Sequence, residues 1–383
     1  MKLTASDSNS HLLRWLAATF VVAVVVAVCV YVNGVAQNIE TSARQISTLQ
    51  SPSAETCAEC HPKQVATFQN APHMRTLLRG NDPRVVALLD DKIYRTAGNT
   101  TFQFKETNGE LWLSSTNYRQ PLRVDWLFGS GQHARTPVSV GTNVDGETEL
   151  LQLNVSWYPQ TGLGPTLGIE LDRMDETGIV GVAAAHGSGQ TEQCFACHVS
   201  ALPMSNGAID FHNLVPAVSC SRCHRNTDMH LKTQGDVSLT LSEWARLSPL
   251  ESVNRCGECH RRADELTPEE LAPQNQQLIR FASVGLTQSA CFIGQQRLWE
   301  KGDGRSHRLD CLTCHDPHRP AETNHDYYNS RCLNCHAKRH ELAKSCSAQR
   351  SSSDCINCHL IKVEVHDGLR FSDHWIRVQK SGD

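Results

Sequence analysis

The pattern Cys-x-x-Cys-His occurs seven times in this chain of 383 residues, and it constrains the fold more than any other feature. One copy stands alone upstream, and six follow within residues 194–359. We number them motifs 1 to 7 in chain order; they lie at 57–61, 194–198, 220–224, 256–260, 311–315, 332–336 and 355–359. The clustered copies leave about 28 residues each, which is too few for a separate apolar core around every motif.

The spacing of the motif has a chemical reason. Two thiols three residues apart can each form a thioether with a vinyl group on one haem edge, and the adjoining histidine then lies under the iron. Half of a tetrahedral zinc site is the alternative, but zinc sites usually pair two such halves and do not require the histidine. We therefore predict seven covalently attached haems c, held by Cys57, Cys60, His61, Cys194, Cys197, His198, Cys220, Cys223, His224, Cys256, Cys259, His260, Cys311, Cys314, His315, Cys332, Cys335, His336, Cys355, Cys358 and His359.

Composition supports this interpretation and excludes another. Aromatic residues make up only 6% of the chain, so the porphyrins would supply apolar volume that side chains do not. The net charge is −4 and no basic run occurs, which argues against nucleic-acid binding.

The N-terminus predicts a membrane anchor. Residues 15–32 carry no charge and are long enough to span a bilayer as a helix, and Lys2 and Arg14 would keep the N-terminus in the cytoplasm. A cleaved signal peptide is the alternative, since small residues at 34–36 could be a cleavage site. We expect an inner-membrane, single-pass protein with its haem domain in the periplasm.

The rest of the chain divides by composition. Residues 101–105, 110–114 and 150–157 alternate apolar and polar residues, with turn signals at 108–109 and 145–146. We expect a cytoplasmic N-terminus (1–14), an anchor or signal (15–33), a linker (34–55), a first haem segment (56–83), a β-rich insert (84–190) and a six-haem domain (191–383). The predicted fold is mainly α-helical and irregular, wrapped around stacked haems, with this insert and an N-terminal transmembrane helix.

The chain resembles the multihaem c-type cytochromes of bacterial periplasms. The resemblance rests on the motifs and on the phrases around them at 57–73, 129–136, 253–261, 289–292, 309–319, 327–336 and 371–378. One departure is that residues 220–230 lack the Gly-Pro-Gly loop that this group often carries before a downstream histidine.

The resemblance implies a second axial histidine for several haems. It favours His73, His133, His230, His318 and His374 as iron ligands. His318 is too close to His315 to reach over the same haem, so it would bind a neighbouring iron. Two further places stay open to His186, His212, His307, His325, His340 and His366.

Two functions follow from these residues. The first is a membrane-anchored heptahaem cytochrome c that relays electrons through haems with two histidine ligands. Its partners would be a membrane electron donor, such as a quinol-linked complex, and a periplasmic redox protein. The alternative is a multihaem oxidoreductase acting on a small nitrogen or sulfur species at one open haem. No Cys-x-x-Cys-Lys motif occurs, which disfavours one kind of nitrite reductase.

Three cysteines lie outside the motifs. Cys29 falls within the predicted anchor, whereas Cys291 and Cys346 flank motifs 5 and 6. They are either a disulfide or two buried thiols, because spacing does not give the distance between them.

Overall fold

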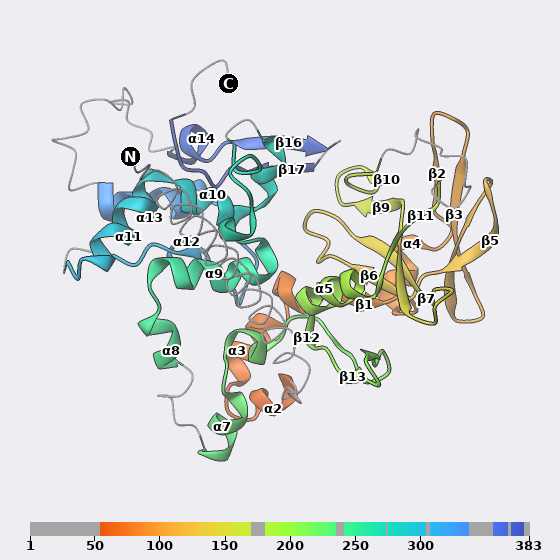
Figure 1. Cartoon of the computed structure of the whole chain (residues 1–383), viewed down its shortest axis with the longest axis horizontal. Coiled ribbons are helices and arrows are strands. Elements are labelled where there is room, and N and C mark those ends of the chain that lie inside the picture. Colours follow the sequence, from red (N-terminus) through yellow and green to blue (C-terminus); the bar gives the residue numbers. More distant parts are fainter. Residues whose placement is uncertain are drawn as a thin grey trace, which may run out of the picture.

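The computed structural model describes residues 54–169, 181–234, 241–272, 275–303, 307–336, 355–366 and 369–378. Most helices gather in one part of the molecule and most strands in another, with helix α5 (Ser188–His198) lying where the two parts meet (Figure 1). The motifs from 2 to 7 follow the strand-rich part in sequence, and motif 1 precedes it.

The strand-rich part contains two antiparallel sheets and a separate hairpin. The larger sheet has the order β1 (Leu77–Arg79), β6 (Trp126–Phe128), β7 (Thr136–Thr142), β8 (Thr148–Leu153), β11 (Ala183–His186). The smaller sheet runs β2 (Ile93–Arg95), β3 (Thr101–Thr107), β4 (Glu110–Ser115), β5 (Tyr118–Arg123). Strands β9 (Val155–Tyr158) and β10 (Gly162–Pro165) form the hairpin, and helix α4 (Pro83–Leu89) packs beside β3.

Side-chain alternation explains the smaller sheet. Phe102 and Phe104 are fully buried while their neighbours face outward, as a strand with one face toward a core requires. The predicted turn at 108–109 joins β3 to β4, and Asn108 and Gly109 both have positive φ, at 55° and 81°. The sequence signals for these two strands and their turn are confirmed.

A second apolar cluster joins the larger sheet to motif 2. Trp126 and Phe128 of β6 pack edge-on against Phe195 of α5, with ring centroids 5.9 and 5.0 Å away. Phe195 sits inside motif 2 and is fully buried. The sheet therefore fixes the helix that carries this motif.

The helical part consists of short elements. They are α2 (Ala54–Ala58), α3 (Pro62–Phe68), η1 (Pro72–Arg75), α6 (Cys220–Cys223), α7 (Thr227–Lys232), α8 (Leu241–Arg246), α9 (Pro249–His260), η3 (Ala263–Glu265), η4 (Gln276–Arg280), α10 (Ala282–Gln288), α11 (Ala290–Glu300), α12 (Cys311–Cys314), α13 (His325–His336) and α14 (Cys355–His359). Its apolar core among described residues is small, built on Val253, Leu286 and Phe292. Further apolar side chains of this part are buried, among them Val65, Phe68 and Val284, but together they are few for that many helices.

The predicted fold class needs correction, because the described part is about 38% helix and 26% strand, in several sheets. Hairpins also occur among the motifs, where the prediction placed none. They pair β12 (Val199–Ala201) with β15 (Val215–Pro216), β13 (Met204–Ser205) with β14 (Ala208–Ile209), and β16 (Lys362–His366) with β17 (Leu369–Ser372). These strands of two to five residues were not predicted, although residues 362–366 alternate polar and apolar residues.

The membrane prediction also needs correction. No helix in the described ranges is long and apolar enough to cross a bilayer. Helices α9 and α13 have 12 residues each, about 18 Å at a helical rise of 1.5 Å per residue, against a hydrocarbon core of about 30 Å. The predicted span at 15–33 lies outside the described residues. Within the described residues, the structure does not support a single-pass anchor in the inner membrane.

Replacing the buried Phe104 by alanine should lower the free energy of unfolding by about 3–5 kcal/mol, because the ring leaves a cavity between the strands. Val144→Ala, at a fully exposed turn position, should change it by less than about 0.5 kcal/mol. Urea unfolding followed by circular dichroism measures both. Equal effects of the two substitutions would contradict this account of the core.

Candidate haem centres

Six of the seven motifs place both cysteines on one face of a short helix, whereas in motif 1 the helix α2 ends at Ala58, between Cys57 and Cys60. The clearest cases are α5, α9, α13 and α14, which all end at the motif histidine. Residues three and four apart lie on the same helical face, so both thiols and the imidazole point toward one side. In motifs 3 and 5 the histidine follows the helix directly. This arrangement suits a haem edge bound by two thioethers with an imidazole beneath its iron.

Four motif histidines face a second histidine at nearly the same distance. The ring centroids are 6.1–6.3 Å apart in the pairs His61–His230, His73–His260, His224–His318 and His315–His374. A metal lies about 2 Å from an imidazole nitrogen, and half a ring adds roughly 1 Å, so two rings on opposite sides of one iron have centroids about 6 Å apart. The observed spacing fits an iron between the rings.

Hydrogen bonds orient several of these rings. The Nδ1 atoms of His198, His359 and His374 lie 2.9, 3.1 and 2.9 Å from the backbone oxygens of Thr76, Arg377 and Ser372. Nδ1 of His318 lies 2.9 Å from a carboxylate oxygen of Asp316. An Nδ1–H that donates to oxygen leaves Nε2 as the coordinating atom, which is the usual arrangement of metal-binding histidines.

His260 lies in the interior yet keeps accessible surface. Burial lowers its pKa to about 4, and the nearby rings of His73, His198 and His374 lower it further. The residue nevertheless keeps accessible surface, because a ring that lines an internal space is surrounded by protein and still open on one side. A residue in such a place fits a large flat ligand.

An asparagine replaces the missing Gly-Pro-Gly loop after motif 3. Asn226 adopts the left-handed conformation, with φ 61° and ψ 26°, directly before α7. Asparagine tolerates this region better than other non-glycine residues. The turn at Asn226 sets the direction of α7, and His230 in this helix faces His61.

Of the five histidines predicted as second ligands, the structure places four opposite a motif histidine: His73, His230, His318 and His374. His133 instead lies beside Phe371 of β17, with ring centroids 4.5 Å apart, and burial and the nearby Lys362 lower its pKa. Its assignment as an iron ligand stays a prediction, as do the attachment sites themselves.

The six other histidines that were considered as second iron ligands lie in positions that fit this role less well. Both ring nitrogens of His186 bond to glutamine side chains, at 3.2 Å to Gln190 and 3.0 Å to Gln152. Nε2 of His366 lies 3.1 Å from the backbone oxygen of Pro165. The others are exposed or lie outside the described residues: His212, His307, His325 and His340.

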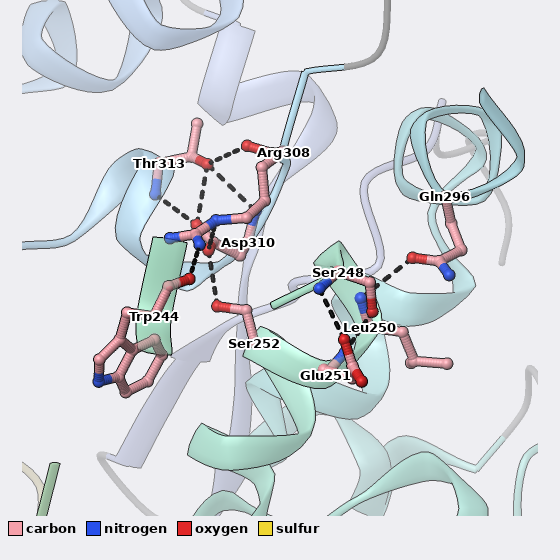
Figure 2. A network of polar contacts seen from close by, with 9 residues as sticks. All are labelled: Trp244, Ser248, Leu250, Glu251, Ser252, Gln296, Arg308, Asp310 and Thr313. Atoms are coloured by element: carbon pink, nitrogen blue, oxygen red, sulfur yellow. Dashed lines mark hydrogen bonds and ion pairs between the residues drawn. The ribbon is translucent and has the colours of Figure 1, made fainter. Parts of the chain in front are cut away.

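A polar network that the sequence did not reveal joins motifs 4 and 5 (Figure 2). Asp310 caps α12 by accepting from the backbone N–H of Thr313, and its other carboxylate oxygen accepts from Ser252 of α9 at 2.7 Å. Arg308 lies 2.9 Å from the same carboxylate, which is 3% exposed. Aspartate directly before a motif is a recognisable N-cap signal.

The network extends to motif 3 through a tryptophan. Arg308 donates to the backbone oxygen of Trp244, and the indole N–H of Trp244 donates to the backbone oxygen of Cys223 at 3.0 Å. Arg255 of α9 lies over the same indole, 5.2 Å from its centroid. Side chains thus connect motifs 3, 4 and 5 directly.

Cys291 lies in α11 near the motif cysteines Cys314, Cys332 and Cys335, and burial raises its pKa. Cys346 lies outside the described residues, so the choice between a disulfide and two buried thiols stays open.

Comparison with known proteins gives a partial match. Residues 171–225, which include motifs 2 and 3, match the model of the family described as cytochrome c554 and c-prime. No curated protein matches. One solved structure, that of the outer cell wall cytochrome OcwA, aligns at 15% identity with a TM-score of 0.34. That alignment covers 54% of this chain and spans 36% of the OcwA chain.

The family match agrees with the motifs. It supports a c-type cytochrome that binds haem c covalently and transfers electrons.

His73→Ala should leave every thioether in place but convert one haem from low spin to high spin, because the iron facing His260 loses a ligand. Electron paramagnetic resonance of the oxidised protein measures this change. His212→Ala, at an exposed position, is the matched control and should leave the spectrum unaltered. An unchanged spectrum for His73→Ala would show that the pair does not share an iron.

Asp310→Ala should cost about 3 kcal/mol of unfolding free energy, because Arg308 loses its buried partner and α12 its cap. The exposed pair of Arg262 and Asp264 provides the control, and Asp264→Ala should cost less than about 1 kcal/mol. Denaturant titration of the haem-loaded protein compares them. A loss of similar size in both variants would contradict the role given to the network.

Proposed function

We propose that this c-type cytochrome is an electron relay of seven haems c, of which those on motifs 1, 3, 4 and 5 have two histidine ligands. The observation that carries the proposal is the set of four facing histidine pairs at 6.1–6.3 Å. The haem iron supplies reversible one-electron chemistry, and two imidazoles leave it no open position for a substrate.

The chain contributes the orientation of the histidine ligands. The carbonyl groups of Thr76, Arg377 and Ser372 fix ring orientation through Nδ1. Fixed axial ligands require little rearrangement when an electron arrives, and this favours electron transfer over the conversion of a substrate. As partners we propose a quinol-linked donor complex and a second redox protein as acceptor.

A second candidate function has one observation in its favour. His198 contacts Phe128, with ring centroids 4.8 Å apart, and no second imidazole faces it at the pair spacing within the described residues. A haem with one protein ligand can bind a small molecule. An oxidoreductase acting on a small nitrogen or sulfur species at motif 2 is therefore the alternative.

Spectroscopy separates the two functions. The protein, once shown to contain seven haems per chain, is examined by electron paramagnetic resonance when oxidised and by carbon monoxide addition when reduced. A relay without an open iron predicts only low-spin signals and no carbon monoxide shift. One high-spin iron that takes up carbon monoxide, and whose carbon monoxide complex changes its absorption in His198→Ala, would favour the oxidoreductase.

A further inference from the structure

Two arginines keep buried guanidinium nitrogens that have no hydrogen-bond partner within the described residues. These nitrogens are Nε of Arg75, at the end of η1, and Nη1 of Arg135, directly before β7. Nη2 of Arg75 donates to the backbone oxygen of Asn70 at 3.0 Å. Nη2 of Arg135 donates to the backbone oxygen of Ser130, also at 3.0 Å. Both guanidinium groups are therefore held in place while one nitrogen of each stays unsatisfied, which is costly inside a protein.

The described residues offer these two arginines no carboxylate partner. Asp82 lies near Arg135, but its oxygens accept from Nε and Nη2 of Arg84 at 2.9 and 2.7 Å. Burial lowers the pKa of Arg135, and the positive charges of Arg75 and Arg84 lower it further. Like charges that lie this close in a partly buried place are stabilised by an anion.

The segments that carry the two arginines meet at the histidine of motif 2. Thr76 follows Arg75, and its backbone oxygen lies 2.9 Å from Nδ1 of His198. The hydroxyl of Thr76 also donates to the backbone oxygen of His198 at 3.2 Å. Phe128, at the end of β6, packs against the ring of His198 with centroids 4.8 Å apart. A haem on motif 2 would therefore lie beside both segments.

A tight loop after β6 holds Arg135 near Arg75. Its first residue, Gly129, donates its N–H to the backbone oxygen of Thr76 at 2.7 Å. Gly131 lies so close to the guanidinium group of Arg135 that a Cβ there would fall 2.7 Å from Nε, and its φ of 85° also suits glycine. The loop thus leaves room for this guanidinium group.

We propose that Arg75 and Arg135 bind a propionate carboxylate of the haem on motif 2. The propionates leave a haem at the edge opposite its thioether bonds, so their protein partners come from segments other than the motif helix, as these arginines do. Guanidinium groups bind carboxylates through parallel N–H donors, and each arginine has a nitrogen available. The inference rests on the haems of the proposed function and applies whether motif 2 relays electrons or converts a substrate.

This site affects the reduction of the haem that it binds. A ferric haem carries one more positive charge than a ferrous haem, so guanidinium groups beside its propionate favour the reduced form. The two arginines should therefore make the haem on motif 2 easier to reduce than neutral side chains would.

The test is a redox titration of the full haem-loaded chain, followed by electron paramagnetic resonance. Arg75→Gln or Arg135→Gln should lower the ratio of reduced to oxidised haem at motif 2 about tenfold at a fixed potential, a shift of about 59 mV to lower potential. Arg75→Lys keeps the charge and should change this ratio by less than about threefold. The haem on motif 2 is identified as the one whose signal changes in His198→Ala.

Arg84→Gln is the matched control. Arg84 carries the same charge nearby, but it is paired with Asp82 and its side chain is 64% exposed. This variant should change the ratio by less than about twofold, because solvent screens an exposed charge. Two glutamine variants are made so that one remains if the other does not retain seven haems and native circular dichroism.

Replacing chloride by sulfate at constant ionic strength separates a propionate from a free oxyanion. A propionate is part of the attached haem, so sulfate should not move the potential at motif 2. A sulfate-dependent shift that disappears in Arg75→Gln would overturn the propionate in favour of a free anion.

The remaining outcomes each decide one question. An unchanged potential in both glutamine variants, or an equal shift in Arg84→Gln, would overturn the site. A shift confined to a different haem would overturn its assignment to motif 2. A wild-type chain without haem on motif 2 would contradict the proposed function as well, whereas the other results leave that function intact.

Discussion

The facing imidazole pairs are the interaction on which the helical part depends. Each pair joins a motif to a residue that follows a different motif: His230 comes after motif 3 and faces motif 1, whereas His73 comes after motif 1 and faces motif 4. With an iron between the rings, each pair becomes a cross-link between distant segments. The few buried apolar side chains of this part could not replace such links.

The strand-rich part is stabilised by its own apolar side chains rather than by imidazole pairs. Its sheets are held by buried rings such as Phe102 and Phe104 and need no cofactor to be compact. Phe195 belongs to the second apolar cluster, on the larger sheet, so motif 2 is anchored by side-chain packing as well. The C-terminal hairpin makes a further connection, because His366 of β16 bonds to Pro165 in β10.

The sequence could predict the chemistry of the site better than its architecture. Motif spacing is a local property, so attachment residues could be predicted, and the turn at 108–109 located, without coordinates. The second histidine that faces each motif histidine could not be located in this way, because it depends on how distant segments of the chain pack together. The hairpin β16–β17 and the cap at Asp310 were missed, although residues 362–366 alternate and aspartate is a recognised N-cap, because signals this short also occur in loops. The prediction of a mainly helical fold was wrong for the same reason, because it did not include these short strands.

The separation of the paired histidines along the chain also governs assembly. His61 and His230 are 169 residues apart, and His73 and His260 are 187 apart. Closing such loops costs chain entropy before any contact repays it, so these pairs form late in folding. Thioether bonds need only five consecutive residues and can form on an extended chain. The protein would then mature in two stages. The haems would first be attached to an open chain, and the second axial bonds would form only when segments far downstream pack against them.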